Sequence, residues 1–272
     1  MRCTSPLTFG QSVENPLGVK IPCGRCMACR INKRTEWCVR LLHELEYWDH
    51  KASFITLTYD DAYLHLSGLV KRDLQTFFKR LRKRYKDIKY YAVGEYGEEN
   101  LRPHYHAIVF GFKPNDLYFQ EESRGRKRYT SKELDSIWKL GRTNVGVVEP
   151  DTVQYVCGYV VKKLGGDLAN YVYGPKQRPF ALISKGLGLR HVLDNKEKYQ
   201  ENPEVIRKGK RLALPRYYRV KAEVNPIKIE GASLKSQVKY AEELEKSASQ
   251  TFQKQNEQRE KNLQSRSDHY EK

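Results

Sequence analysis

Two β-forming segments joined by a short polar link constrain the fold of this chain more than any other feature. The first, residues 90–95, ends at Glu95, and the second begins with His104 and His106 and continues as an apolar run. Strands separated by such a link, here residues 97–102, are expected to pair as an antiparallel hairpin. Because side chains alternate between faces along a strand, the two histidines share one face. Glu95 on the neighbouring strand can then lie beside them.

Two imidazoles and one carboxylate form a ligand set suited to Mg²⁺ or Mn²⁺. The pattern has simpler explanations as well, since a His-x-His pair on a strand is often only hydrogen-bonded or solvated. Glu95 alone could be an ordinary surface acid, and Glu98 and Glu99 in the link compete for the same role. The hairpin therefore predicts a candidate metal site at His104, His106 and Glu95.

Further strands and amphipathic helices surround the hairpin in the sequence. Apolar residues recur at helical spacing over residues 32–48 and 71–84. Apolar and polar residues alternate over 53–59, and a further strand is expected over 144–149, where Pro150 ends it. Mixed strands and helices of this kind indicate an α+β protein.

The charge of the chain favours a polyanionic partner. Its 272 residues include 50 Lys and Arg against 33 Asp and Glu, a net charge of +17, and nucleic acid is the first expectation. The helix over 71–84 is especially basic, and the alternative for such a helix is a solvated surface. The residues expected to contact DNA are Lys79, Arg80, Lys83, Arg84 and, from the link of the hairpin, Arg102.

No part of the sequence resembles a membrane segment. No run approaches the roughly 20 apolar residues that a spanning helix needs, and the polar start of the chain lacks the apolar core of a signal peptide. We therefore expect a cytosolic protein with no membrane partner.

Four of the six cysteines lie in the first 30 residues, at Cys3, Cys23, Cys26 and Cys29. Two-residue spacings let neighbouring thiolates share one ion, so these cysteines are candidates for a structural Zn²⁺ site. The alternative is a set of reduced thiols that pack as small apolar groups. An iron–sulfur cluster is less favoured because Cys38 lies too far along the chain and no Cys-Pro pair follows.

The segment 151–164 predicts a helix with chemistry on one side. At helical spacing, Tyr155 and Tyr159 share a face with Lys162 and Lys163, while valines form a buried stripe. The simpler interpretation is that the tyrosines are packing residues. A tyrosine with an ordinary pKa near 10 is a poor nucleophile, but a divalent ion can assist its attack on a phosphodiester.

The sequence after residue 166 is less regular. A glycine-rich turn at 184–189 lacks the pattern of a nucleotide-binding loop, and residues 207–219 combine basic and aromatic side chains in a way suited to nucleic acid. We therefore expect four segments. They are a Cys-rich segment with a basic helix (1–50), a catalytic core (51–166), a basic accessory region (167–225) and a charged tail, helical or disordered (226–272).

Three short motifs resemble, in order and spacing, those of the HUH endonucleases that initiate rolling-circle replication. They are residues 54–59, 102–106 and 155–163. The resemblance is closest to the replication initiators of microviruses, especially the gokushovirus-like single-stranded DNA phages, and it spans roughly residues 1 to 220. Supporting similarities lie in residues 23–26, Glu36–Trp37, 94–97, 184–188 and 214–218.

The resemblance implies a fold and a mechanism. The expected fold is an HUH-like antiparallel sheet flanked by helices, with the metal held by His104 and His106 and Glu95 as third ligand. Tyr155 and Tyr159 would be the nucleophiles, and either Lys162 or Lys163 the motif lysine. Gly158 departs from the family pattern, which often has a basic residue before the second tyrosine.

The implied activity is site-specific nicking and rejoining of single-stranded DNA at a replication origin. A 5′-phosphotyrosine would form, and a 3′ hydroxyl would be left for the host polymerase, with a host helicase unwinding the DNA in the cytoplasm of the bacterial host. Two alternatives remain. One is a non-catalytic, zinc-stabilised binder of single-stranded nucleic acid, and the other is a relaxase or transposase of the same chemical family.

Overall fold

The structure is a computed structural model that describes residues 2–11, 18–49, 51–97, 100–123, 125–162, 166–207, 209–227, 229, 254 and 256–264. The chain divides into two compact units, described separately below. One comprises residues 41–187, and the other combines residues 1–40 with 188–272. The four segments expected from the sequence stay predictions.

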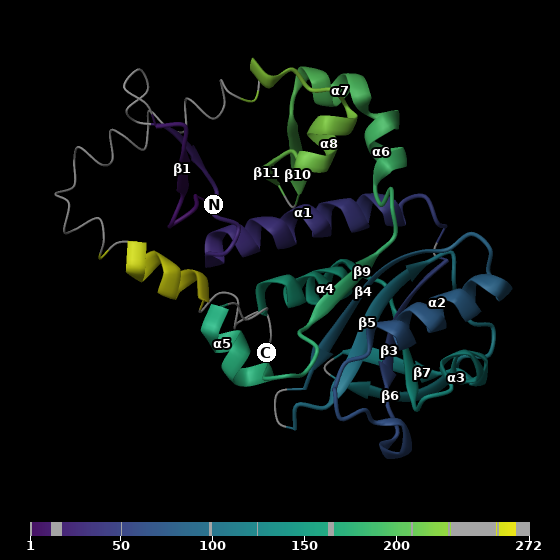
Figure 1. Ribbon diagram of the computed structural model, residues 1–272. Coiled ribbons are helices and arrows are strands. Elements are labelled where there is room, and N and C mark those ends of the chain that lie inside the picture. The colour runs from purple at the N-terminus through teal and green to yellow at the C-terminus, as the bar shows by residue number, and fades with distance from the viewer. Residues whose placement is uncertain are drawn as a thin grey trace. The chain divides into compact units, whose positions relative to one another are not determined.

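A seven-stranded sheet forms the centre of the unit of residues 41–187 (Figure 1), and every neighbouring pair of strands is antiparallel. In spatial order its strands are β6 (Tyr118–Ser123), β7 (Arg126–Thr130), β8 (Thr143–Val147), β3 (Ala52–Thr58), β5 (Pro103–Phe110), β4 (Lys89–Tyr96) and β9 (Phe180–Ile183). The predicted hairpin is the pair β4–β5. The α+β class and the antiparallel sheet flanked by helices are confirmed.

One face of the sheet packs against α2 (Lys71–Arg84) and α3 (Lys132–Trp138). The bounds of α2 are those expected from its apolar spacing, and Phe77 and Phe78 are fully buried. The strands contribute every second residue to this core, among them Ile55, Leu57 and Tyr105. This face therefore forms the main apolar core of the unit.

The opposite face of the sheet carries α4 (Pro150–Lys162), which contacts β4 and β5 (Figure 1). Val153 and Val156 of the predicted stripe are fully buried. The alternate residues of β3 and β5 point to this side, so the histidines of β5 face α4. The remaining short elements of this unit are η1 (Asp61–Tyr63) and α5 (Gly166–Tyr173).

The stretch after residue 166 is more regular than its sequence suggests. It contributes α5, the edge strand β9, and five further short elements: α6 (Leu189–Asp194), α7 (Lys196–Glu201), β10 (Glu204–Arg207), β11 (Lys210–Ala213) and α8 (Arg216–Lys221). Elements of four to eight residues complete too few turns or alternations for periodicity to reveal them.

The unit of residues 1–40 and 188–272 has a small core of its own. Its other elements are the paired strands β1 (Leu7–Phe9) and β2 (Val19–Ile21) and the start of α1 (Met27–Leu45), a helix that continues into the other unit. The helix predicted over 32–48 thus begins five residues earlier. The buried residues of this core are Val39, Val192, Tyr199, Val205, Leu214, Tyr218, Ala222 and Val224.

Most of the predicted charged tail, residues 226–272, lies outside the described residues. Residues 256–264 are helical, and the Glu260 carboxylate accepts a 2.8 Å hydrogen bond from the backbone N–H of Met27, the first residue of α1. Among the described residues, no helix has the length and apolar character needed to cross a membrane.

Candidate active site

Glu95, His104 and His106 converge as the hairpin predicts. The register places Glu95 directly opposite His104 and Val93 opposite His106. The Nε2 atoms of the two histidines lie 2.7 Å (His104) and 3.1 Å (His106) from the same Glu95 oxygen, Oε1. The three side chains are largely enclosed, and His106 is only 6% exposed. Two imidazoles thus share one carboxylate oxygen.

The other ring nitrogens are held from behind. His104 Nδ1 lies 3.1 Å from the backbone carbonyl oxygen of Arg102, which can only accept, so this nitrogen carries a proton. His106 Nδ1 lies 3.0 Å from the hydroxyl of Thr56, the residue opposite it on β3. Such partners fix the tautomer and orientation of metal-binding histidines. Both Nε2 atoms are therefore aimed at the same point.

The arrangement fits a divalent ion. Two ligands at right angles on one ion, each about 2.1 Å away, are about 3.0 Å apart, close to the two Oε1–Nε2 distances. The candidate donor atoms of all three residues lie within 4.8 Å of one another. A neutral His104 that donates from Nδ1 cannot also donate to Glu95, so positive charge is required between these groups. The chain supplies the geometry of a metal site here.

The carboxyl group of Glu95 is strongly acidic in this setting. Burial alone would raise its pKa, but the hydrogen bonds and charges of His104 and His106 outweigh burial and lower the pKa to about 2. Glu95 is therefore ionised at neutral pH and available as an anionic ligand.

Both predicted tyrosines of α4 lie against the histidines. The ring of Tyr159 stacks on His106 with centroids 5.3 Å apart, and Tyr155 meets His106 edge-on at 5.7 Å. The two tyrosine rings are 5.2 Å apart, and Phe54 of β3 packs against Tyr155 at 6.2 Å. The guanidinium of Arg126 on β7 lies 5.6 Å from the centre of the Tyr155 ring.

The environments of the two tyrosines differ. Tyr159 is only 6% exposed, whereas Tyr155 is half-buried. Burial, the charge of Glu95 and the neighbouring Tyr155 all raise the pKa of Tyr159 far above that of a free phenol. Tyr159 is thus a neutral phenol in this structure.

The two candidate lysines cannot be placed with the same detail. Lys162 is the last residue of α4, and its side chain is not described, while Lys163 lies outside the described residues. At Gly158 an added Cβ would meet no atom within 4 Å, so the backbone packing leaves room for a side chain where the family pattern has a basic residue.

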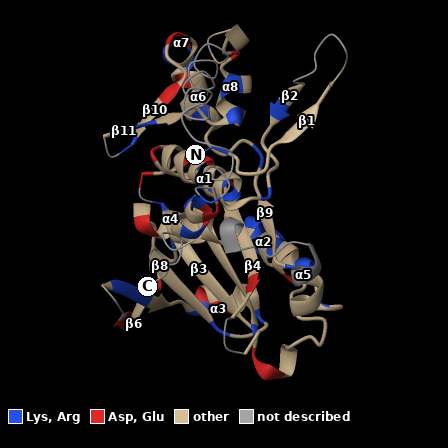
Figure 2. Ribbon diagram, turned by 90° about the vertical axis from the view of Figure 1, so that its left-hand side faces the viewer, with Lys and Arg blue, Asp and Glu red and all other residues tan. Residues whose placement is uncertain are grey.

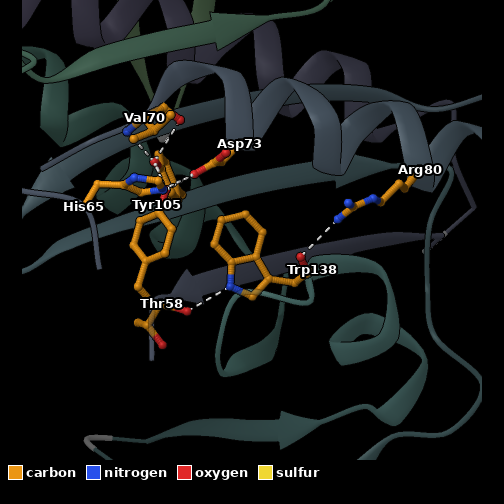
Figure 3. A network of polar contacts seen from close by, with 8 residues as sticks. Thr58, His65, Val70, Asp73, Arg80, Tyr105 and Trp138 are labelled. Carbon is orange, nitrogen blue, oxygen red and sulfur yellow. Dashed lines mark hydrogen bonds and ion pairs between the residues drawn. The ribbon is translucent and has the colours of Figure 1, made fainter. Parts of the chain in front are cut away.

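The residue between the two histidines takes part in a different network, on the α2 face (Figure 3). The Tyr105 hydroxyl lies 2.8 Å from that of Tyr59, and it donates to the carbonyl of Val70 and accepts from the N–H of Val70. Tyr59 also donates to Asp73 at 2.8 Å. Trp138 seals this region and donates from its indole to the Thr58 carbonyl. Sequence reasoning missed the network, although Tyr59 belongs to the first motif.

The structure does not bring the predicted DNA-binding residues of α2 together with the tyrosines. Helix α2 (Figure 2) packs on the opposite face of the sheet from α4. Arg80 donates to the carbonyls of Ile137 and Trp138 at the end of α3, and Arg84 pairs with Glu133 at 3.4 Å. Lys79 and Lys83 are exposed.

Arg102, the fifth predicted DNA-binding residue, is anchored beside the metal ligands. Its guanidinium donates to Asp61 at 2.7 Å and to the Tyr59 carbonyl, and its own carbonyl accepts from His104. Arg102 therefore connects the end of the hairpin link with the segment after β3.

The four N-terminal cysteines form a second group of metal-ligating atoms, in the other unit. The sulfurs of Cys3, Cys23, Cys26 and Cys29 lie within 4.8 Å of one another, and none is in a disulfide. Burial raises the pKa of Cys3 and Cys29. Hydrogen bonds outweigh burial at Cys23 and Cys26, where they lower the pKa, to about 6 at Cys26.

Comparison with known proteins gives the region of the site a family context. The family model of the replication-associated protein ORF2 matches residues 52–164, from β3 through α4. Residues of all three motifs, including both histidines and both tyrosines, fall inside this match. No solved structure matches the chain.

Three phage proteins are similar over most of this chain. Replication-associated protein VP4 of Bdellovibrio phage phiMH2K is 34% identical over 217 residues, 72% of this chain and 65% of that protein. Replication-associated protein ORF2 of Spiroplasma virus 4 is 34% identical over 214 residues, 73% and 66% of the two chains. Replication-associated protein ORF4 of Chlamydia phage 1 is 31% identical over 212 residues, 73% and 52%.

The matched part of this chain spans just under two thirds of the length of the first two relatives, at 65% and 66%. Similarity of this extent identifies the family rather than the role of any residue. The sequence and the comparisons together place the chain with the replication-associated proteins of microvirus-like phages.

Proposed function

We propose that this protein initiates rolling-circle replication as a metal-dependent HUH-type endonuclease that nicks and later rejoins single-stranded DNA at a phage origin. One observation carries the proposal. The Nε2 atoms of His104 and His106 converge on a single oxygen of Glu95, and both tyrosine rings of α4 lie against His106. The similarity to phage replication-associated proteins supports the same assignment.

The proposed cofactor is Mg²⁺ or Mn²⁺, held by His104, His106 and Glu95. Oxygen and imidazole ligands suit these ions, and a bound ion would polarise the scissile phosphate and offset its developing negative charge. Thr56 and the Arg102 carbonyl would orient the two rings from behind. The second metal group, with four sulfurs, has the chemistry of a structural Zn²⁺ site instead.

In the proposed nicking step, a tyrosine Oη attacks the phosphorus of one phosphodiester. The Oη–P bond forms and the P–O3′ bond breaks, while the phenol loses its proton and the leaving 3′ oxygen gains one. The product is a 5′-phosphotyrosine and a free 3′ hydroxyl. Rejoining is the same exchange in reverse, so the energy of the phosphodiester is kept for ligation.

Two tyrosines suit two such exchanges in one replication cycle. Tyr155 and Tyr159 are one helical turn apart, with rings 5.2 Å from each other, so either can approach the same phosphate position after a small movement. Tyr155 is the more exposed of the two. Lys162 or Lys163, at the end of the same helix, would add positive charge for the DNA strand.

The proposed setting is the cytoplasm of a bacterial host. The 3′ hydroxyl would be extended by the host polymerase, and the sequence contains no P-loop motif, so a host helicase would unwind the DNA. Lys79, Arg80, Lys83 and Arg84 of α2 lie on the far face of the sheet from α4. Together with Arg102 they would therefore contact DNA outside the cleaved phosphate.

A covalent-adduct assay tests the proposal. Full-length protein is incubated with Mn²⁺ or Mg²⁺ and labelled single-stranded oligonucleotides that tile the phage genome, and adducts are separated on denaturing gels. Wild type should form a metal-dependent adduct. Tyr155→Phe/Tyr159→Phe and His104→Ala should form none, whereas Tyr171→Phe, at a side chain that is 89% exposed, should behave as wild type.

Other outcomes would identify the alternatives. DNA binding without an adduct on any oligonucleotide would contradict the nuclease and point to a non-catalytic binder of single-stranded nucleic acid. An adduct whose 3′ hydroxyl is transferred to a second strand but not extended by polymerase would indicate a relaxase or transposase.

A further inference from the structure

The first 27 residues have almost no apolar core to hold them. Among the described residues from 2 to 27 none is buried, and all six residues of β1 and β2 are exposed. The first buried side chains are Ala28 and Cys29 in α1. A two-stranded hairpin alone is at best marginally stable in water, so another interaction must hold this segment on the helix.

Four sulfurs meet where the segment joins α1. Cys3 comes just before β1, Cys23 and Cys26 lie between β2 and the helix, and Cys29 is in its first turn. The Sγ atoms of Cys3 and Cys26 are 3.7 Å apart, and all four sulfurs lie within 4.8 Å of one another. A disulfide needs an S–S distance of about 2.05 Å, so these sulfurs are not bonded to each other.

The spacing of the sulfurs matches a tetrahedral ion. Four ligands each about 2.3 Å from Zn²⁺ are separated by about 3.8 Å, close to the distance between Cys3 and Cys26. The sulfurs of an iron–sulfur cluster are held further apart because several irons stand between them. The donor set is all thiolate, which Zn²⁺ prefers and Mg²⁺ does not.

Backbone amides are aimed at the sulfurs. The N–H groups of Arg25 and Cys26 donate to Cys23 Sγ at 3.4 and 3.3 Å, and the N–H of Cys23 donates to Cys3 Sγ at 3.3 Å. The loop of residues 23–26 therefore wraps its amides around one sulfur. Donors that surround metal-bound thiolates in this way offset their charge and fix their direction.

We propose that Cys3, Cys23, Cys26 and Cys29 bind one structural Zn²⁺ ion that clamps the β1–β2 hairpin to the start of α1. The ion links a residue before β1 with two residues after β2 and one in the helix, so it closes both ends of the hairpin. All four ligand positions are filled by cysteine, which leaves no site for water or substrate, and the role is structural. The proposal does not depend on the nuclease activity.

Metal content tests the proposal directly. Full-length protein is purified under reducing conditions after expression with zinc, and bound metal is measured by mass spectrometry. About one zinc per chain is expected in wild type, in His104→Ala, which removes a ligand of the other site, and in the control Cys38→Ala. Cys26→Ser and Cys29→Ser should lose it. Equal zinc in wild type and Cys26→Ser would overturn the proposal.

Two measurements on unaltered protein remain decisive if the variants fail to fold. Cobalt in place of zinc should give the charge-transfer and ligand-field absorption of a tetrahedral tetrathiolate site. Removal of zinc by a chelator should make the four cysteines reactive toward an alkylating reagent, and residues 2–26 sensitive to protease, and zinc should reverse both. Bound iron, a metal-free disulfide, or no change on chelation would each contradict the zinc clamp.

Discussion

The two faces of the central sheet use adjacent residues of β5 in opposite ways. On the α2 face, Tyr105 finds all its partners in the chain, through Tyr59 and both backbone groups of Val70. On the α4 face, His104 and His106 direct their Nε2 atoms at one oxygen of Glu95. The first arrangement is complete, and the second calls for positive charge from outside.

This contrast separates stability from activity along a single strand. A buried hydroxyl network that is fully satisfied stabilises the fold, because each removed partner leaves another polar group unpaired. A convergent set of ligands stabilises little until a cation is bound. Substitutions that alternate along β5 should therefore alternate between loss of stability and loss of activity.

The largest effect is expected from His106→Ala. Loss of an outer partner of a metal ligand already costs about 10–100-fold, so loss of the ligand itself should lower adduct formation by more than about 100-fold. The thermal midpoint in the absence of metal should change far less. Rates of adduct formation and melting curves of the same preparations check this, and a His106→Ala protein with more than a tenth of the wild-type rate would contradict the metal site.

The next largest effect is expected from Thr56→Val, which removes the partner of His106 Nδ1 and keeps the shape of the side chain. Metal affinity should fall about 10–100-fold, and high Mn²⁺ should restore adduct formation. Thr58→Val is the matched control, since Thr58 lies on the same face of β3 but donates to the Arg142 carbonyl. If both variants need the same metal concentration as wild type, Thr56 does not orient the ligand.

On the other face, Tyr105→Phe should cost stability rather than activity. It leaves the buried N–H of Val70 without its acceptor, a loss of about 1–3 kcal/mol. Denaturant unfolding in the absence of metal measures this, and Tyr118→Phe, at an exposed position, should be neutral. A Tyr105→Phe protein of wild-type stability but reduced adduct formation would reverse the roles of the two faces.

The same network predicts a loss of stability at high pH. Burial is the largest influence on Tyr105, and it raises the pKa to about 12; the pKa of Tyr59 is raised further. Because these phenols bind their protons more tightly in the folded state, their contribution is complete below pH 10 and falls as the pH rises toward 12. For Tyr105 it is on the order of 2 kcal/mol, and Tyr105→Phe should flatten the fall in unfolding free energy.

Sequence reasoning reached the parts of the site that depend on local pattern. Strand alternation and a short link were enough to place Glu95 beside the histidines, and helical spacing placed Tyr155 and Tyr159 on one face. Thr56 was missed because its pairing with His106 depends on the register of β3 and β5, which lie 50 residues apart in sequence. Which face α2 covers is likewise set by tertiary packing, and charge patterning alone could not predict the contact of Arg80 with α3.

The smallest effect is expected at Gly158, where α4 lacks a side chain next to Tyr159. An added Cβ meets nothing within 4 Å, and alanine in place of glycine within a helix stabilises by about 0.5–1 kcal/mol. Gly158→Ala should therefore raise the thermal midpoint slightly and leave adduct formation unchanged. Gly158→Lys tests whether the absent charge matters, because it adds a cation without a clash. Stabilisation with unchanged activity in both variants would show that the site works without a basic residue here, and a several-fold gain with lysine alone would show that this charge aids cleavage.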